Sequence, residues 1–180
     1  APEFVLKNTF SAVAGELKSY MDAGYRVLLL ARAKGPDAPD PLGYAVLSNP
    51  IRENAKETFA YFKQQDVCVK VISGDHPRTV SEIAKQAGIE NADKYVDAAL
   101  LVTDEQIAKA AETYTVFGRV SPAQKQQLVR ALQAQGHTVA MTGDGVNDIL
   151  AMKDADCSVA MASGSEAAAQ NAQVVLLDSD

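Results

Sequence analysis

Residues 140–148, AMTGDGVND, run from a short apolar stretch into a cluster of glycines and carboxylates. The apolar part fits a buried strand, and the carboxylates follow directly after its end. A similar ending occurs upstream, where the apolar residues of 67–75, VCVKVISGD, lead into a hydroxyl, a glycine and a carboxylate. Ligands of open parallel sheets bind at the carboxyl ends of the strands. We therefore expect these two strand ends to face one site.

The segments around these strands alternate between strand and helix patterns, which is typical of a parallel sheet covered by crossover helices. Helices are predicted over 50–65 and 77–87, and Thr103 and Ser121 each open a capping-box sequence at the start of a further helix; Gly88 and Gly136 are predicted helix stops.

The first 48 residues differ from the rest. Their pattern predicts a helix over 9–23, a strand over 26–33, an irregular Pro/Asp-rich loop over 35–41 and a second strand over 42–47. The sequence thus predicts an α/β protein with a small α+β piece in 1–48 and the main domain in 49–180.

Charge and composition narrow the possible partners. The 180 residues carry a formal net charge of −6, which disfavours nucleic acid and anionic membrane surfaces as partners. No apolar run approaches the ~20 residues that a membrane-spanning helix needs, so we expect a soluble piece. Cys68 and Cys157 lie in separate apolar stretches and are expected to be buried thiols.

The residue types at the strand ends suit phosphate and magnesium. Asp144 and Asp148 are hard oxygen donors of the kind that Mg²⁺ prefers, and Mg²⁺ usually shares its shell with substrate phosphate and water. Glycines allow the backbone to approach a phosphate closely. Lys125, near the start of a predicted helix, is placed to neutralise phosphoryl charge.

Residues 142–156, TGDGVNDILAMKDAD, closely resemble the hinge motif of P-type cation-transporting ATPases, with Met152 in place of the usual leucine. Residues 73–75 resemble the TGD motif of that family, and 120–125, VSPAQK, resemble the segment with its phosphate-binding lysine. Residues 49–52, NPIR, resemble its DPxR motif, with asparagine for the acidic residue. The start, APE, is similar to the end of its KGAPE motif, and 24–28, GYRVL, resemble a nucleotide-domain strand.

The resemblance implies a haloacid-dehalogenase-like parallel sheet with helices on both faces, preceded by the end of a nucleotide-binding domain. It implies ATP as substrate, Mg²⁺ as cofactor, and cation transport, with calcium as one possible cargo, through a membrane domain of the same polypeptide. The chain would lie on the cytoplasmic face of a membrane, in the resembled bacterial members the cell membrane.

The resemblance also assigns roles to individual residues. Catalytic roles fall to Lys125, Asp144, Asp148, Asn147, Ser73 and Gly74; the two aspartates serve the metal, and nucleotide contacts fall to Asp75, Arg26, Arg52, Arg119, Gly143 and Gly145.

The family's DKTGT motif, whose aspartate is phosphorylated, does not occur in these 180 residues. We therefore expect the chain to be a cut from a longer protein and to be inactive alone. Two alternatives remain open: a soluble haloacid-dehalogenase-type phosphatase, and a non-catalytic nucleotide-binding module. His76 and His137 are expected to be ordinary loop or helix-end residues, and the aromatic residues at 59–62 to belong to the core.

Overall fold

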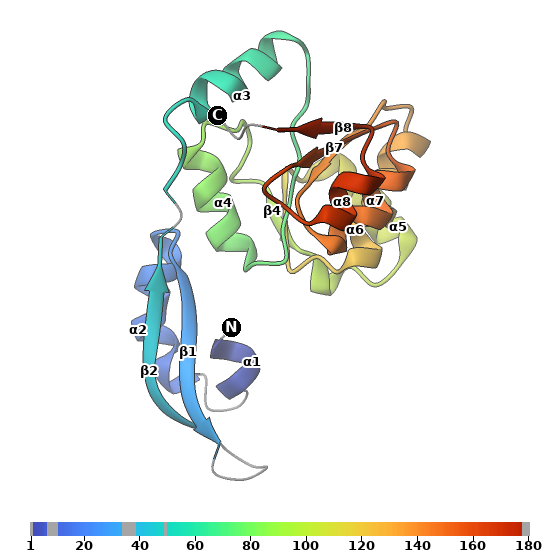
Figure 1. Cartoon of the computed structure of the whole chain (residues 1–180). Coiled ribbons are helices and arrows are strands. Elements are labelled where there is room, and N and C mark those ends of the chain that lie inside the picture. Colours follow the sequence, from blue (N-terminus) through green and yellow to red (C-terminus); the bar gives the residue numbers. More distant parts are fainter. Residues whose placement is uncertain (1, 7–10, 34–38, 49, 178–180) are drawn as a thin grey trace.

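The computed structural model describes residues 2–6, 11–33, 39–48 and 50–177 (Figure 1). Its helices are α1 (Pro2–Leu6), α2 (Ser11–Asp22), α3 (Ala55–Gln64), α4 (Pro77–Gln86), η2 (Ala98–Leu100), α5 (Asp104–Thr113), α6 (Pro122–Ala134), η3 (Val146–Asp148), α7 (Ile149–Asp154) and α8 (Glu166–Asn171). Its strands are β1 (Arg26–Ala33), β2 (Pro39–Leu47), β3 (Val71–Ile72), β4 (Tyr95–Asp97), β5 (Val116–Gly118), β6 (Ala140–Gly143), β7 (Cys157–Met161) and β8 (Val174–Leu176). Within these ranges, every helix is too short or too polar to cross a membrane.

The hairpin β1–β2 and helix α2 form the α+β piece predicted for the first 48 residues (Figure 1). Leu17 of α2 is fully buried, and α2 contacts both β1 and α4. Strand β2 begins at Pro39, so the loop expected over 35–41 is wrong for 39–41, and 35–38 lie outside the described residues. Each strand of this two-stranded sheet has an open edge, and a proline, which lacks an N–H, is tolerated at an edge.

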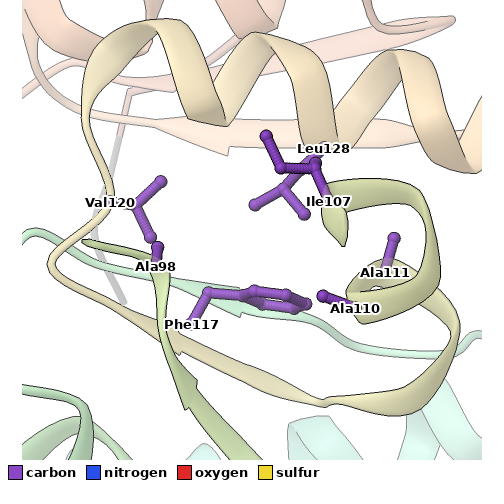
Figure 2. Close-up of a cluster of buried hydrophobic side chains, with 7 residues drawn as sticks. All are labelled: Ala98, Ile107, Ala110, Ala111, Phe117, Val120 and Leu128. Atoms are coloured by element: carbon purple, nitrogen blue, oxygen red, sulfur yellow. The ribbon is translucent and has the colours of Figure 1, made fainter. Parts of the chain in front are cut away.

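The first parallel sheet has the strand order β3-β5-β4. Successive residues of a strand point to opposite faces, and in β5 both Val116 and Phe117 are fully buried. Val116 packs with Val80 and Ala84 of α4. On the other face, Phe117 packs beneath α5 and α6, as Figure 2 shows. Helices on both faces of a parallel sheet are therefore confirmed here.

The second parallel sheet has the order β6-β7-β8. Met141 of β6 and Ala160 of β7 are buried in a cluster that includes residues of α6, α7 and α8. Ala140 and Thr142, which point to the other face of β6, are exposed. Strand β6 is thus well covered on one face only.

The parallel strands form two separate sheets, and the division falls between β3 and β6. These two strands are the edges of separate three-stranded sheets, and the described strands include none that pairs with both. Helix α6 joins the halves, because Leu128 belongs to the core over the first sheet and Val129 to the core over the second. Neighbouring residues on a helix point about 100° apart, so one helix serves both cores.

Residues 67–75 contain less strand than predicted. Only Val71 and Ile72 pair, with β5, while 67–70 are irregular and Cys68 is exposed. The expectation of a buried Cys68 is therefore wrong. An apolar stretch becomes a buried strand only where neighbouring elements cover it. Among the described strands, this segment pairs only with β5, on one side.

Helix α3 begins at Ala55, later than the predicted residue 50, and it contains no buried residue. Tyr61 is 58% exposed and Phe62 38% exposed, so the assignment of these aromatics to the core is wrong. Ala55, Phe59 and Phe62 are spaced by four and then three residues, which indicates a helix face that favours burial. The described residues cover this face only in part, and Phe59 is half-buried.

Several local predictions hold. Thr103 and Ser121 form complete capping boxes with Gln106 and Gln124, and α4 and α6 end just before Gly88 and Gly136. His76 caps α4, where its Nδ1 accepts the Arg78 N–H. These signals are local in sequence, which explains why the sequence was sufficient to locate them.

Candidate phosphate and nucleotide site

The start of helix α6 connects the two strand ends that the sequence analysis singled out. Ser121 caps this helix, and the Val120 N–H just before it donates to the Ser73 carbonyl at 3.0 Å. Lys125, in the first turn, reaches the loop that follows β6. Each strand end is therefore attached to the same helix start, although the two strands do not pair.

Lys125 and Asp148 form the most enclosed ion pair at this place. The Lys125 Nζ lies 2.5 Å from Asp148 Oδ1, and the two side chains are only 12% and 8% exposed. The other carboxylate oxygen of Asp148 accepts the Gly145 N–H at 3.2 Å. A Cβ on Gly143 would lie 2.5 Å from the Asp148 Cβ, so glycine is required there for the carboxylate to fit.

Asp144 has a different setting. It follows β6, is exposed, and its carboxylate has no hydrogen-bond or ion-pair partner among the described residues. Its backbone carbonyl, in contrast, accepts the Ser165 N–H at 2.6 Å. The backbone of Asp144 is thus held while its carboxylate stays available to a ligand.

A second group of polar residues gathers around the loop after β3. Arg26 Nη2 lies 3.4 Å from Asp75 Oδ1, and the Arg119 N–H donates to the Asp75 carbonyl at 2.8 Å. Arg119 adopts a positive φ of 53°, an uncommon backbone conformation for a residue with a side chain. Three residues predicted to contact nucleotide, from the hairpin and from two different loops, thus lie together.

Asp97 is a charged residue of this group that the sequence analysis missed. Its Oδ2 accepts from Arg119 Nη1 at 2.9 Å, and its Oδ1 accepts the Ala99 N–H at 3.0 Å. Both carboxylate oxygens are engaged, so Asp97 fixes the direction of the arginine side chain. No local motif marks Asp97, since its partner lies 22 positions away.

Other predicted site residues form few or no hydrogen bonds at the site within the described ranges. Among the described residues, the side chains of Arg52 and Asn147 form no hydrogen bond or ion pair with the Lys125–Asp148 pair or with the residues around Asp75, and a Cβ on Gly74 would meet open space. Ser73 accepts the Asp75 N–H through its hydroxyl at 3.1 Å. Asn49, from the NPIR segment, lies outside the described residues.

The carboxylates suit a magnesium ion that takes its other ligands from substrate and water. Within the described ranges, no three His, Cys, Asp or Glu side chains converge as a complete metal site. Mg²⁺ is usually bound through one or two carboxylates together with phosphate oxygens and waters. Asp144 fits such a role directly, whereas both oxygens of Asp148 are already engaged by Lys125 and Gly145.

The parallel strands with polar side chains at their carboxyl ends place the chain among α/β proteins that bind ligands at such ends. More narrowly, the chain belongs to the haloacid dehalogenase-like hydrolase family, whose model matches residues 5–156.

Similar proteins include transporters. A probable cation-transporting ATPase, exp7, of Streptococcus pneumoniae is 44% identical over 189 residues, which cover 100% of this chain and 24% of that protein. The calcium-transporting ATPase CtpE of Mycobacterium tuberculosis is 46% identical over 186 residues, covering 99% of this chain and 23% of that protein. A crystal structure of a zinc-transporting PIB-type ATPase in an E2.Pi state matches with a TM-score of 0.59 and 27% identity, over 90% of this chain and 22% of the other. The chain therefore spans about a quarter of the length of these relatives.

Proposed function

We propose that this chain is a catalytic part of a P-type cation-transporting ATPase, with residues 1–48 ending the nucleotide-binding domain and 49–180 forming most of the phosphorylation domain. The enclosed Lys125–Asp148 pair, together with the exposed carboxylate of Asp144 on the same loop after β6, carries this proposal. The similarity to cation-transporting ATPases over the full chain supports it.

Lys125 and Asp144 would both act on the transferring phosphoryl group. The Lys125 ammonium, held by Asp148 near a helix N-terminus, would neutralise charge on the phosphoryl oxygens. Asp144 would hold Mg²⁺, and the bound ion would offset negative charge on the phosphate. Asp148 would serve the metal indirectly, because its position fixes both Lys125 and the Gly145 backbone.

The second group would hold the nucleotide. Arg26 places positive charge beside Asp75, and the guanidinium of Arg119 pairs with Asp97 close by in the same group of residues. ATP phosphates or ribose would meet these two arginines. Arg26 belongs to the hairpin and Arg119 to the loop after β5, so a nucleotide bound there would connect the two parts of the chain.

The accepting aspartate would come from outside these 180 residues, since they contain no DKTGT motif. In the complete protein, phosphorylation and its reversal would shift the preferred conformation of a membrane domain and so move a cation. Calcium is the proposed cargo because the relative CtpE is named as a calcium transporter.

Paired substitutions in the complete transporter test the catalytic assignment. Asp144→Asn should abolish ATPase turnover, because it removes the carboxylate proposed to bind the metal. Asp154→Asn is the matched control, since Asp154 ends α7 and pairs with Arg130 rather than with the site. Equal losses of activity at matched expression would refute the assignment.

The 180-residue chain alone tests whether the phosphorylated aspartate lies outside it. Incubated with radiolabelled ATP and Mg²⁺, it should not form an acid-stable phosphoprotein that hydroxylamine cleaves. Stoichiometric labelling that hydroxylamine removes would show that the nucleophile lies inside this chain.

A further inference from the structure

The turn after β7 is built against the backbone of Asp144. The Ser165 N–H donates to the Asp144 carbonyl at 2.6 Å, and the turn itself is closed by the Gly164 N–H on the Met161 carbonyl at 3.0 Å. A Cβ on Gly164 would lie 2.5 Å from the Asp144 carbonyl oxygen, 2.9 Å from its Cα and 3.0 Å from its Cβ. Only glycine allows this contact without displacing Asp144.

Asp144 needs such an external restraint because of its neighbours in sequence. It stands between Gly143 and Gly145, and glycine has more backbone freedom than any other residue. Its carboxylate has no partner among the described side chains, so its side chain does not fix its position. The backbone contact from the turn after the neighbouring strand supplies that restraint.

We propose that Gly164 and the Ser165 N–H are positioning groups that hold Asp144 for Mg²⁺. This inference rests on the proposed function, in which Asp144 binds the metal. The Ser165 hydroxyl is not involved, because it makes no side-chain cap bond to α8 and only its backbone N–H reaches Asp144. The turn would thus affect Mg²⁺ binding indirectly, because it holds the backbone of Asp144 in place.

Two substitutions at one position isolate the restraint. Ser165→Pro removes the N–H and places a methylene where its hydrogen lies, while the φ of −72° at Ser165 suits proline. Ser165→Ala keeps the N–H and is the matched control. Gly164→Ala is a second, independent perturbation, since its new methyl group would collide with Asp144.

The measurement is the Mg²⁺ concentration that gives half-maximal ATPase activity of the complete transporter, together with Mn²⁺ binding by equilibrium dialysis. Loss of groups that orient metal ligands typically weakens metal affinity about 10–100-fold. We expect shifts of about 10-fold or more for Ser165→Pro and Gly164→Ala in both assays, and less than about twofold for Ser165→Ala. Excess Mg²⁺ should restore turnover in the first two variants, which a general folding defect would not allow.

Two results would overturn the inference, and they are distinguishable. If Ser165→Pro and Gly164→Ala match Ser165→Ala in both assays, or lose turnover that Mg²⁺ does not restore, the turn does not position the metal ligand. If Asp144→Asn itself leaves Mn²⁺ binding unchanged, the proposed role of Asp144 fails and the inference fails with it.

Discussion

The Lys125–Asp148 pair allows a quantitative test of how the site is held together. Lys125→Met keeps the length of the side chain but removes its charge, and it leaves the Asp148 carboxylate 8% exposed and without its ion-pair partner. Breaking a buried ion pair from one side costs about 3–5 kcal/mol, because the remaining charge stays desolvated. Asp148 keeps the Gly145 N–H, so we expect a loss near the lower end, about 3 kcal/mol.

Removing the second charge should recover much of this loss. In Lys125→Met/Asp148→Asn no buried charge remains, and replacing a buried pair by neutral groups is often close to neutral in stability. Asp148→Asn alone also leaves a buried charge, that of Lys125, without its partner. The double-mutant cycle should therefore give a coupling energy of at least about 2 kcal/mol between the two positions. In urea, with a slope of about 2 kcal/mol/M, Lys125→Met alone should lower the unfolding midpoint by about 1.5 M.

An exposed pair provides the control. Lys63 and Glu90 lie 2.6 Å apart but are 64% and 62% exposed, so Lys63→Met should cost less than about 1 kcal/mol. A coupling energy below about 0.5 kcal/mol between Lys125 and Asp148, within the range of independent sites, would refute the view that burial makes this pair important.

Three further outcomes are expected. The Val139 N–H on Asp156 holds the pKa of that carboxyl below its usual value, so Asp156→Asn should lower the urea midpoint at pH 7. The difference from the wild type should shrink as the pH falls through the lowered pKa, and a difference that does not change as the solution is acidified would contradict this. In the complete transporter, Asp97→Asn should raise the KM for ATP about fivefold and leave kcat unchanged. A fivefold change corresponds to about 1 kcal/mol, the value expected for a partly exposed ion pair. An unchanged KM would show that Asp97 does not orient Arg119 for ATP. In hydrogen exchange, the Ile72 amide should exchange faster than the Val71 amide, which donates to the Thr115 carbonyl. In a longer chain that includes the DKTGT segment, the Ile72 amide should exchange more slowly. An equal exchange rate of the Ile72 amide in the two chains would show that no strand is added at β3.

The sequence was sufficient for features whose cause is local. The capping boxes at Thr103 and Ser121 were predicted because cap and partner lie three residues apart and the apolar helix face follows directly. The hinge-like segment after β6 was recognised because its residues are contiguous. Its buried carboxylate, Asp148, forms an ion pair with Lys125, which was also singled out from the sequence.

Features that depend on distant partners were missed for a physical reason. Gly164 and Asp97 act on Asp144 and Arg119, which are 20 and 22 positions away, and neither contact leaves a repeating pattern in the sequence. The exposure of Cys68 has a related origin, since its apolar stretch has the composition of a buried strand but too few neighbours. Composition indicates what a segment favours, whereas burial also requires a surface to cover it.

The division of the sheet explains why helix α6 matters for the site as well as for the core. In a continuous parallel sheet, hydrogen bonds between strands would fix the strand ends relative to each other, but β3 and β6 are edges of separate sheets. Leu128 and Val129 fasten α6 to the two cores, and the first turn of the same helix presents Lys125 to Asp148. The relative position of the two strand ends therefore depends in this chain on side-chain packing around one helix.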